Sequence, residues 1–212
     1  SLTIPVRRLS RLCARRVLVP LSVPGGNKLA QKTFNPKLGI TGGISIIGTS
    51  GIVRPFSSEA FVNSIRKEIQ VARALGCPSI VINSGAKSEN YLRSRFPDLP
   101  AQAFIHYGNY IGDTLRLANE EGITHITMGI MIGKAVKLAE GHLDTHSRNV
   151  VMNRDFITSL AVESHCHPTN IARVAEITLA RELWELFADT PAFFTQLVDR
   201  CMTVCRPLLS HA

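Results

Sequence analysis

The sequence lacks both long apolar runs and paired cysteines. No stretch reaches the roughly 18 consecutive apolar residues that a membrane-spanning helix needs, so no transmembrane segment is predicted. The five cysteines are an odd number and form no C-x-x-C pair. This usage disfavours a disulfide framework and indicates reduced thiols in a cytoplasmic protein.

Several catalytic motifs are also missing. The chain contains no G-x-S-x-G, H-E-x-x-H, Rossmann G-x-G-x-x-G or paired-carboxylate motif. Hydrolase and dehydrogenase functions therefore have no support from the residues. The chain is rich in apolar residues: 45% of its 212 residues are hydrophobic, and its mean hydropathy is +0.11. That composition predicts a folded chain with a buried core.

Acidic residues are absent from the first 16 positions, which carry five arginines. Removing this segment leaves 19 of the 24 Lys and Arg residues against 16 Asp and Glu residues. The net charge of +8 is therefore mostly a property of a terminal arm. Such an arm is typical of a transit peptide, and it also leaves nonspecific nucleic-acid binding open.

Three successive units each combine an apolar strand, a glycine turn and a helix. The expected strands are residues 79–85, 103–108 and 123–133. Their glycines, Gly85, Gly108 and Gly133, follow one another at intervals of 23 and 25 residues. This alternation predicts an α/β fold with a doubly wound, mostly parallel sheet. Ligands bind such sheets outside the carboxyl ends of the strands, where these turns are expected.

Helices flank these units and continue to the end of the chain. Ser57 and Ser58 are candidate N-caps of a helix that Gly76 ends. The later helices are expected at 155–163, at 169–187 and from Pro191 onward. The chain is accordingly divided into a basic N-terminal arm (1–16), an α/β ligand-binding core with a predicted strand at 17–23 (17–168), and C-terminal helices packed on that core (169–212).

The glycine-rich segment at residues 41–51, TGGISIIGTSG, resembles a phosphate-binding loop but lacks its lysine. Thr49 stands where a Walker A loop has Lys, so no side chain there would neutralise a triphosphate. The residues between the glycines favour a short buried strand with a glycine turn at each end. Those turns would let a flat ligand approach the backbone, or they merely form tight corners.

The segment GHLDTHSRN (141–149) concentrates polar groups. His142 and His146 are four residues apart, but Gly141 and the Asp-Thr pair disfavour the helix that a zinc site would need. The segment is either a capped turn or a site that offers hydroxyl, imidazole and guanidinium groups to an anionic ligand. SHCHP (164–168) is interpreted as a surface loop, and no metal site is expected.

Several consecutive motifs together resemble one family. SVPGG, KTFNPKLGITGGISIIGTSGIV, GNYIGDTL, IGKAVKLAEG and DTHSR are similar to the CbiD-type cobalt-precorrin-5B C1-methyltransferases over residues 17–209. The resemblance implies a methyltransferase that uses S-adenosylmethionine to methylate C1 of a cobalt-bound tetrapyrrole in anaerobic cobalamin biosynthesis. The family works without the G-P-G-D signature of the common tetrapyrrole methylases, and this chain lacks that signature too.

The resemblance implies a site at the glycine turns. Cofactor contacts are expected from Thr41, Gly42, Gly43, Gly48, Thr49, Ser50, Gly51, Gly85, Gly108, Asn109 and Gly112. Substrate contacts are expected from Gly133, Lys134, Lys137, Asp144, Thr145, Ser147 and Arg148. The two lysines and the arginine would meet the carboxylates of the corrinoid. His146 is the candidate proton-handling group, and catalysis would consist mainly of alignment and desolvation.

Two departures from the family bear on activity. The family's threonine- and glycine-rich N-terminal region does not precede SVPGG here, and the arginine arm in its place does not resemble the family. Ile130-Met131 stands where Gly-His is expected. If the absent region completes the corrinoid pocket, the chain is expected to bind S-adenosylmethionine but to turn over poorly. A catalytically silent corrinoid- or nucleotide-binding module and a basic-arm nucleic-acid binder stay as alternatives, and a homo-oligomer is left open.

Overall fold

The computed structural model describes residues 23–33, 35–36, 39–45, 57–77, 79–146 and 150–209. In chain order the α-helices and strands are α1 (Gly26–Ala30), α2 (Ser58–Ala74), β1 (Ile80–Asn83), α3 (Ala86–Arg95), β2 (Phe104–His106), α4 (Ile111–Glu120), β3 (Ile126–Gly129), α5 (Ile132–Ala139), α6 (Arg154–Glu163), α7 (Pro168–Arg173), α8 (Leu183–Leu186) and α9 (Pro191–Cys205). Short 3-10 helices are η1 (Ala101–Ala103), η2 (Ala180–Glu182) and η3 (Arg206–Leu208). None of the helices in these ranges could bridge a lipid bilayer.

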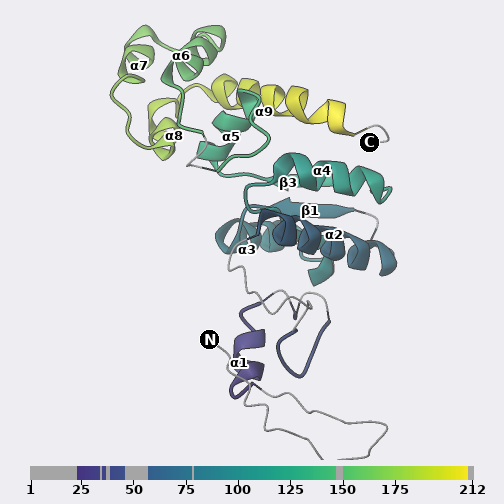
Figure 1. The fold of residues 1–212 in the computed structure, drawn as a ribbon. Helices are drawn as coiled ribbons and strands as arrows, with labels where there is room; N and C mark the ends of the chain where they lie inside the picture. The colour runs from purple at the N-terminus through teal and green to yellow at the C-terminus, as the bar shows by residue number, and fades with distance from the viewer. Residues whose placement is uncertain are drawn as a thin grey trace, which may run out of the picture.

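The three strands form one parallel sheet in the order β2-β1-β3. Figure 1 labels β1 and β3, which lie between α2 and α4 in that view. β1 is central, and its last residue, Asn83, pairs with His106 of β2 and with Gly129 of β3. All four residues of β1 are buried, as is usual where a parallel sheet is covered on both faces. The predicted α/β fold with a parallel sheet is confirmed.

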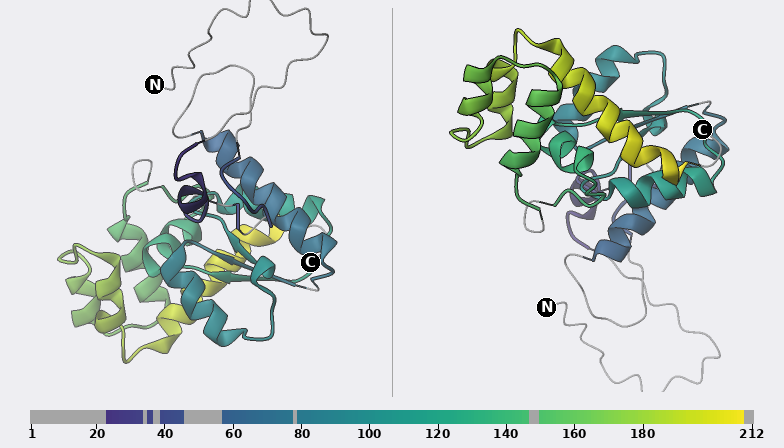
Figure 2. Two further views of the ribbon diagram at one scale, coloured as in Figure 1. Left: turned by 90° about the horizontal axis from the view of Figure 1, so that it is seen from below. Right: turned by 90° about the horizontal axis from the view of Figure 1, so that it is seen from above.

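Helices cover both faces of the sheet (Figure 2). On one face, Leu92 of α3 packs against Val81 and Phe104. On the other face, Ile82 and Ile105 belong to the main core, together with residues of α4, α5 and α9. Helices on two faces are the arrangement that alternating strands and helices predict.

Helix α2 begins and ends as its sequence predicts. The Ser57 hydroxyl accepts a hydrogen bond from the Ala60 amide (3.2 Å). At the other end Gly76 has φ 70°, a left-handed conformation that glycine adopts without strain. The amides of Gly76 and Cys77 donate to the carbonyls of Arg73 (2.9 Å) and Ala72 (3.1 Å). These two bonds form a Schellman motif, so Gly76 is a structural stop.

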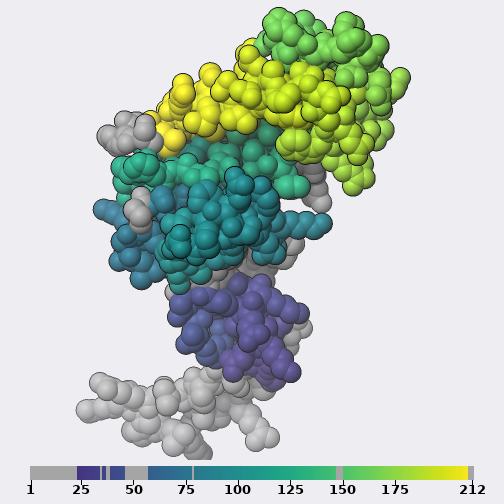
Figure 3. Space-filling view, turned by 180° about the vertical axis from the view of Figure 1, so that it is seen from behind, coloured from purple at the N-terminus to yellow at the C-terminus, as the bar shows by residue number. Residues whose placement is uncertain are grey.

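The last helix packs across the α/β layer. In Figure 3, α9 (yellow) lies over the teal residues that include α4 and α5. The Cys201 thiol of α9 donates to the Ala135 carbonyl of α5 (3.3 Å). Cys201 and Cys205, which are one helical turn apart, are both buried.

The third predicted strand is shorter than expected. The apolar run 123–133 was predicted to be a strand that ends in a turn at Gly133, but β3 stops at Gly129 and α5 begins at Ile132. β3 ends there because its partner β1 ends at Asn83, opposite Gly129. Gly133 is therefore a helical residue of α5, and the prediction of a third glycine turn at that position is wrong.

The helix predicted at 169–187 is broken. α7 ends at Arg173 and η2 begins at Ala180. Between them, the Arg154 guanidinium donates two hydrogen bonds to the Ile177 carbonyl (2.8 and 3.2 Å). The Glu182 carboxylate accepts from the amides of Thr178 (3.2 Å) and Leu179 (2.7 Å). Side chains thus satisfy the backbone groups that a continuous helix would have paired.

Some predictions fall on residues outside the described ranges. They include nearly all of the strand expected at 17–23, the arm at 1–16, and the positions of Gly48, Thr49, Ser50 and Gly51. The described part of the glycine-rich segment, residues 41–45, contains no strand, and Thr41 and Gly42 are exposed.

Candidate ligand-binding corner at the carboxyl edge of the sheet

All three strands end at the same edge of the sheet. Asn83, His106 and Gly129 are paired neighbours at their carboxyl ends. The segments that begin with Ser84 and Tyr107 therefore leave the sheet side by side. Gly85 and Gly108 lie on these two segments, so the predicted glycine turns of the first two units do share one edge, which is the usual ligand-binding edge of such sheets.

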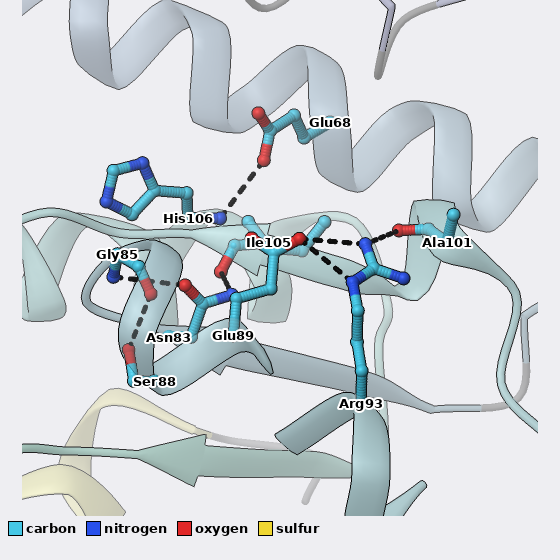
Figure 4. Close-up of polar contacts among 9 residues, drawn as sticks. All are labelled: Glu68, Asn83, Gly85, Ser88, Glu89, Arg93, Ala101, Ile105 and His106. Carbon is cyan, nitrogen blue, oxygen red and sulfur yellow. Dashed lines mark hydrogen bonds and ion pairs between the residues drawn. The ribbon is translucent and has the colours of Figure 1, made fainter. Parts of the chain in front are cut away.

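Asn83 ties the first two of these segments together (Figure 4). Its side-chain amide donates to the Ile105 carbonyl (3.1 Å), and its side-chain oxygen accepts from the Gly85 amide (3.1 Å). Asn83 is fully buried, and its side chain links the Gly85 turn to the end of β2. The Gly85 turn is thereby fixed relative to β2.

Replacing Asn83 by alanine is expected to lower the free energy of unfolding by about 3 kcal/mol. The substitution removes both hydrogen bonds of a fully buried side chain, each worth about 0.5–1.5 kcal/mol, and leaves a cavity where the side chain was. Urea unfolding followed by circular dichroism measures the change. Ser88→Ala is the matched control on the same turn: it removes the half-buried hydroxyl that bonds the Gly85 carbonyl (2.8 Å), and is expected to cost no more than about 1 kcal/mol. Equal losses in the two variants would contradict this role of Asn83.

A buried acid from α2 closes the outer edge of β2. Glu68 is 4% exposed, and its Oε2 accepts from the His106 amide (3.1 Å; Figure 4). Glu68 belongs to none of the sequence motifs that indicated the site. The available signal was an acidic residue next to Ile69 and three positions after Ile65, both on the buried face of α2. Acids are rare at such positions unless they are hydrogen bonded.

A second segment crosses the start of α4. Tyr110 and Asp144 form an isolated antiparallel bridge. The Thr145 amide donates to the Asn109 carbonyl (3.1 Å), and the Gly112 amide donates to the Leu143 carbonyl (3.2 Å). Residues 143–146 are thus held against residues 109–112. The structure brings together two motifs, GNYIGDTL and DTHSR, whose first residues are 36 positions apart in the sequence.

Gly108 and Gly112 each permit the close approach of another side chain, Phe61 of α2 at Gly108 and Leu143 at Gly112. Gly108 has φ 60°, and a Cβ there would lie 3.0 Å from Cζ of Phe61. At Gly112 a Cβ would lie 2.8 Å from Cβ of Leu143, closer than two carbon atoms can approach without strain. These glycines are explained by packing, and contact with a cofactor is not needed to account for them.

Two lysines from α5 point into the crossing. The Lys134 ammonium donates to the Gly108 carbonyl and lies 5.5 Å from the centre of the Tyr107 ring. The Lys137 ammonium is 3.5 Å from the Thr145 carbonyl. Burial lowers the pKa of Lys134, the nearby charge of Lys137 lowers it further, and Asp144 opposes both. An anion placed here would relieve the repulsion between the two ammonium groups.

Thr145 contributes a buried hydroxyl. The residue is 2% exposed, and its Oγ1 has no hydrogen-bond partner among the residues whose placement is described. An unsatisfied buried hydroxyl costs about 1–3 kcal/mol. A ligand that supplies a partner to this group would recover part of that free energy.

We refer to Gly108, Lys134, Lys137, Asp144 and Thr145 as the lysine corner. His146 adjoins it, because its amide donates to Oδ1 of Asp144 (3.0 Å) and forms a tight turn there. The corner combines two ammonium groups, one hydroxyl, one carboxylate and a neighbouring imidazole. Such a set suits an anionic ligand with several hydrogen-bonding groups.

Other predicted site residues lie elsewhere. Gly43 accepts from the Asn35 side chain (3.0 Å) in the segment around α1, well apart from α5 in Figure 1. A Cβ on Gly133 would lie 3.3 Å from Cβ of Ala180, so this glycine meets η2. Ser147 and Arg148 fall outside the described residues. The roles assigned to all these residues stay predictions.

His142 and His167 have local partners. Nε2 of His142 is 3.7 Å from the Glu140 carboxylate. Nδ1 of His167 accepts from the Thr169 amide (3.4 Å) and caps α7. His165 has φ 55° in the turn after α6. The SHCHP segment is therefore a connection between two helices that the His167 side chain helps to form.

Two family models match the chain. Residues 4–55 match the model described as CbiD, and residues 144–212 match the model described as CbiD, C-terminal domain. The first match begins inside the arginine arm, which corrects the expectation that this arm does not resemble the family. The second begins at Asp144, in the lysine corner.

Curated relatives carry one shared name, cobalt-precorrin-5B C(1)-methyltransferase. The protein from Prosthecochloris aestuarii is 44% identical over 194 residues, 90% of this chain and 52% of the relative. That from Geobacillus sp. (strain WCH70) is 40% identical over 190 residues, 89% of this chain and 52% of the relative. The protein from Thermus thermophilus is 38% identical over 186 residues, which cover 87% of this chain and 51% of the relative. The chain thus spans about half the length of these relatives. No solved structure matches it significantly.

Proposed function

This chain belongs to the CbiD family, and on that premise we propose that it acts as an S-adenosylmethionine-dependent C-methyltransferase on C1 of cobalt-precorrin-5B, in cobalamin biosynthesis. One observation carries the proposal. The alignment with the Prosthecochloris protein of that name extends over 194 of the 212 residues at 44% identity. An alignment of that length includes the lysine corner.

The charge of the corner supports an anionic substrate. A ring-contracted tetrapyrrole carries many carboxylates, and Lys134 and Lys137 present two ammonium groups 3 positions apart on α5. Lys134 is half-buried, so its interaction with a carboxylate is less screened by water than that of a surface lysine. We assign carboxylate binding to these two lysines, with Arg148 as a further candidate.

The cofactor is assigned to the same edge of the sheet. When bound, S-adenosylmethionine supplies a reactive methyl group on a positively charged sulfur. Asp144 is the one carboxylate of the lysine corner. The Thr145 hydroxyl, which has no partner in the described part of the chain, fits a polar group of either ligand. The carbonyls of Gly108 and Asn109 already accept from Lys134 and from the Thr145 amide. These two carbonyls are therefore less available to the positively charged sulfur of S-adenosylmethionine than their predicted role as cofactor contacts requires.

The protein is proposed to contribute to catalysis mainly by positioning the two reactants. A macrocycle carbon is the nucleophile, so the chain needs no activated Ser or Cys, and holding the two reactants in line lowers the barrier. Cys201 and Cys205 agree with this, because burial raises the pKa of each thiol, to about 12 and about 11, and keeps both protonated at neutral pH. We propose that His146, beside Asp144, handles the proton released from the substrate.

Methyl transfer tests the proposal directly. The purified chain, S-adenosylmethionine with a labelled methyl group and cobalt-precorrin-5B are expected to give labelled tetrapyrrole. His146→Ala is expected to lower kcat about a hundredfold, the size of a lost general base, with unchanged affinity for S-adenosylhomocysteine by calorimetry. His142→Ala, on the exposed side of the same segment, is the control and should keep full activity.

Three outcomes separate the alternatives. Binding of both ligands without label transfer would favour a silent binding module. Salt-sensitive retention of nucleic acid that disappears when residues 1–16 are deleted, without ligand binding, would favour a nucleic-acid binder. Normal turnover by His146→Ala would remove the role assigned to that residue and leave the methyl-transfer proposal standing.

A further inference from the structure

A cavity of about 280 Å³ lies on the other side of α5 from the lysine corner. β3 and its continuation form one wall with Ile126, Met128 and Ile130, and α9 forms the opposite wall. On α5 the lining residues are Ile132 and Ala135, whereas Lys134 and Lys137 occupy different positions around the helix. The volume is close to the lower end, about 300 Å³, of the range for small-molecule pockets.

The rim of this cavity is open and aromatic. Trp184 is 55% exposed and Val198 is 58% exposed. The Trp184 ring stacks on the Phe194 ring with their centres 4.4 Å apart, and both residues line the cavity. β3 is one of the two edge strands of the three-stranded sheet, and no strand within the described residues pairs with its free edge. The exposed surface suits a flat apolar group that stacks on aromatic and thioether side chains.

One charged residue, Arg206, lines the cavity. It follows α9 directly and is exposed, and no acidic side chain in the described ranges forms an ion pair with it. The two thiols of the lining, Cys201 and Cys205, are kept neutral by burial, which raises the pKa of both. Among the described residues that line the cavity, the only formal charge is therefore positive, and it complements an anion.

We propose that this cavity binds a small aromatic anion, with its flat body between β3 and α9 and its carboxylate or sulfonate group on Arg206. The inference goes beyond the proposed methyl transfer, because it concerns a second site with its own ligand. It does not depend on the lysine corner or on the family of the chain. The two sites are distinguishable by variants of different residues.

The single tryptophan of the chain provides a local signal, because Trp184 is part of the cavity wall. The probes are 8-anilinonaphthalene-1-sulfonate and its uncharged counterpart N-phenyl-1-naphthylamine. Titration of the intact chain with the sulfonate is expected to quench Trp184 emission by energy transfer, to saturation at one probe per chain. Arg206→Gln is expected to weaken sulfonate binding about tenfold and to leave binding of the uncharged probe within about twofold.

Two further variants serve as controls. Arg206→Lys keeps the charge and should restore most of the sulfonate affinity. Arg200→Gln removes an arginine of α9 that is not in the lining and pairs with Glu163 (2.7 Å), so it should bind both probes normally. Circular dichroism verifies that each variant is folded.

Several results would overturn the inference. One is an equal loss of affinity for the charged and uncharged probes in Arg206→Gln. Another is quenching without saturation at one probe per chain, which would indicate a general apolar surface. A third is a chain that forms dimers by light scattering with Trp184 shielded from acrylamide before any probe is added, since a second copy would then occupy the cavity.

Discussion

Replacing Lys134 by methionine is expected to weaken the binding of cobalt-precorrin-5B on the order of a hundredfold. A hydrogen bond to a charged group contributes about 1.5–3 kcal/mol, which corresponds to about 10- to 150-fold in affinity. The upper half of that range applies because Lys134 is half-buried, so its charge is poorly screened. Methionine keeps the apolar stem of the side chain and removes the ammonium group alone.

The matched variant is Lys137→Met on the same helix. The Lys137 ammonium lies 3.5 Å from its carbonyl partner, at the limit of a hydrogen bond, and its loss is expected to weaken substrate binding about tenfold or less. Calorimetry with cobalt-precorrin-5B measures both changes. Titration with S-adenosylhomocysteine serves as the internal control and should give unchanged affinities. Lys134→Met with wild-type substrate affinity would show that the lysine corner is not the substrate site.

The lowered pKa of Lys134 adds a pH dependence with a definite sign. Burial, assisted by Lys137, lowers this pKa below its ordinary value of 10.5, so deprotonation begins at a lower pH than for a free lysine. Only the protonated form pairs with a carboxylate. Substrate affinity is therefore expected to fall as the pH rises through the alkaline range below 10.5. The fall should be shallower in Lys134→Met.

The lowered pKa of Lys134 also makes the stability of the folded chain depend on pH. Stability is expected to rise with pH, whereas substrate affinity falls. Because the folded-state pKa lies below the unfolded one, the folded chain holds the charged ammonium at a cost when the pH is below the folded pKa. That cost disappears as the pH rises from the folded to the unfolded pKa. Stability of the free chain should thus gain from Lys134→Met near neutral pH, offset by the Gly108 carbonyl that loses its donor. A steep fall in the melting temperature of Lys134→Met near neutral pH would contradict the prediction that the gain and the loss nearly cancel.

Local sequence patterns were sufficient for much of the fold. Ser57 and Gly76 mark the two ends of α2 because the groups that cap a helix lie within four residues of its ends. Pro191 marks the start of α9 for the same kind of reason, since proline fits the first helical turn. The strand-glycine-helix pattern likewise gave the order of elements and the edge of the sheet where Gly85 and Gly108 lie.

Long-range contacts decided what the patterns missed. The break after Arg173 depends on Arg154, which donates to the Ile177 carbonyl from 23 positions away in the sequence. The end of β3 at Gly129 depends on where β1 ends, although the apolar run continues to Ile132. A periodic or apolar window contains no information about either partner.

In the candidate site, too, motifs indicated some of the residues, whereas other features depend on long-range contacts. Lys134, Asp144 and Thr145 were selected from motifs, and the structure does bring them together. The sequence did not indicate that the Thr145 hydroxyl is buried without a described partner, because that depends on how residues 143–146 cross α4. It also offered a cofactor role for Gly112, whose position is accounted for by the approach of Leu143.

Gly112→Ala is expected to lower the melting temperature by about 2–4 °C, which corresponds to a net loss of about 1 kcal/mol for a chain of this length. The new Cβ would lie 2.8 Å from Cβ of Leu143, so residues 143–146 must move away from α4, and overpacking of this kind costs about 1–3 kcal/mol. The better helix propensity of alanine, worth about 1 kcal/mol, offsets only part of the loss. The movement also displaces Thr145, so methyl transfer should fall further than the change in stability explains.

A double-mutant cycle isolates the contact. Leu143→Gly removes the opposing Cβ, and together with Gly112→Ala it should show a favourable coupling of about 1–2 kcal/mol in unfolding measurements. Gly26→Ala is the matched helical control, because its Cβ would lie at an ordinary 3.6 Å from Cβ of Val23, and it should be neutral or slightly stabilising. Additive effects of Gly112→Ala and Leu143→Gly on the free energy of unfolding would mean that the two residues are not in steric contact. The crossing of residues 143–146 over α4, on which the lysine corner depends, would then need a different physical basis.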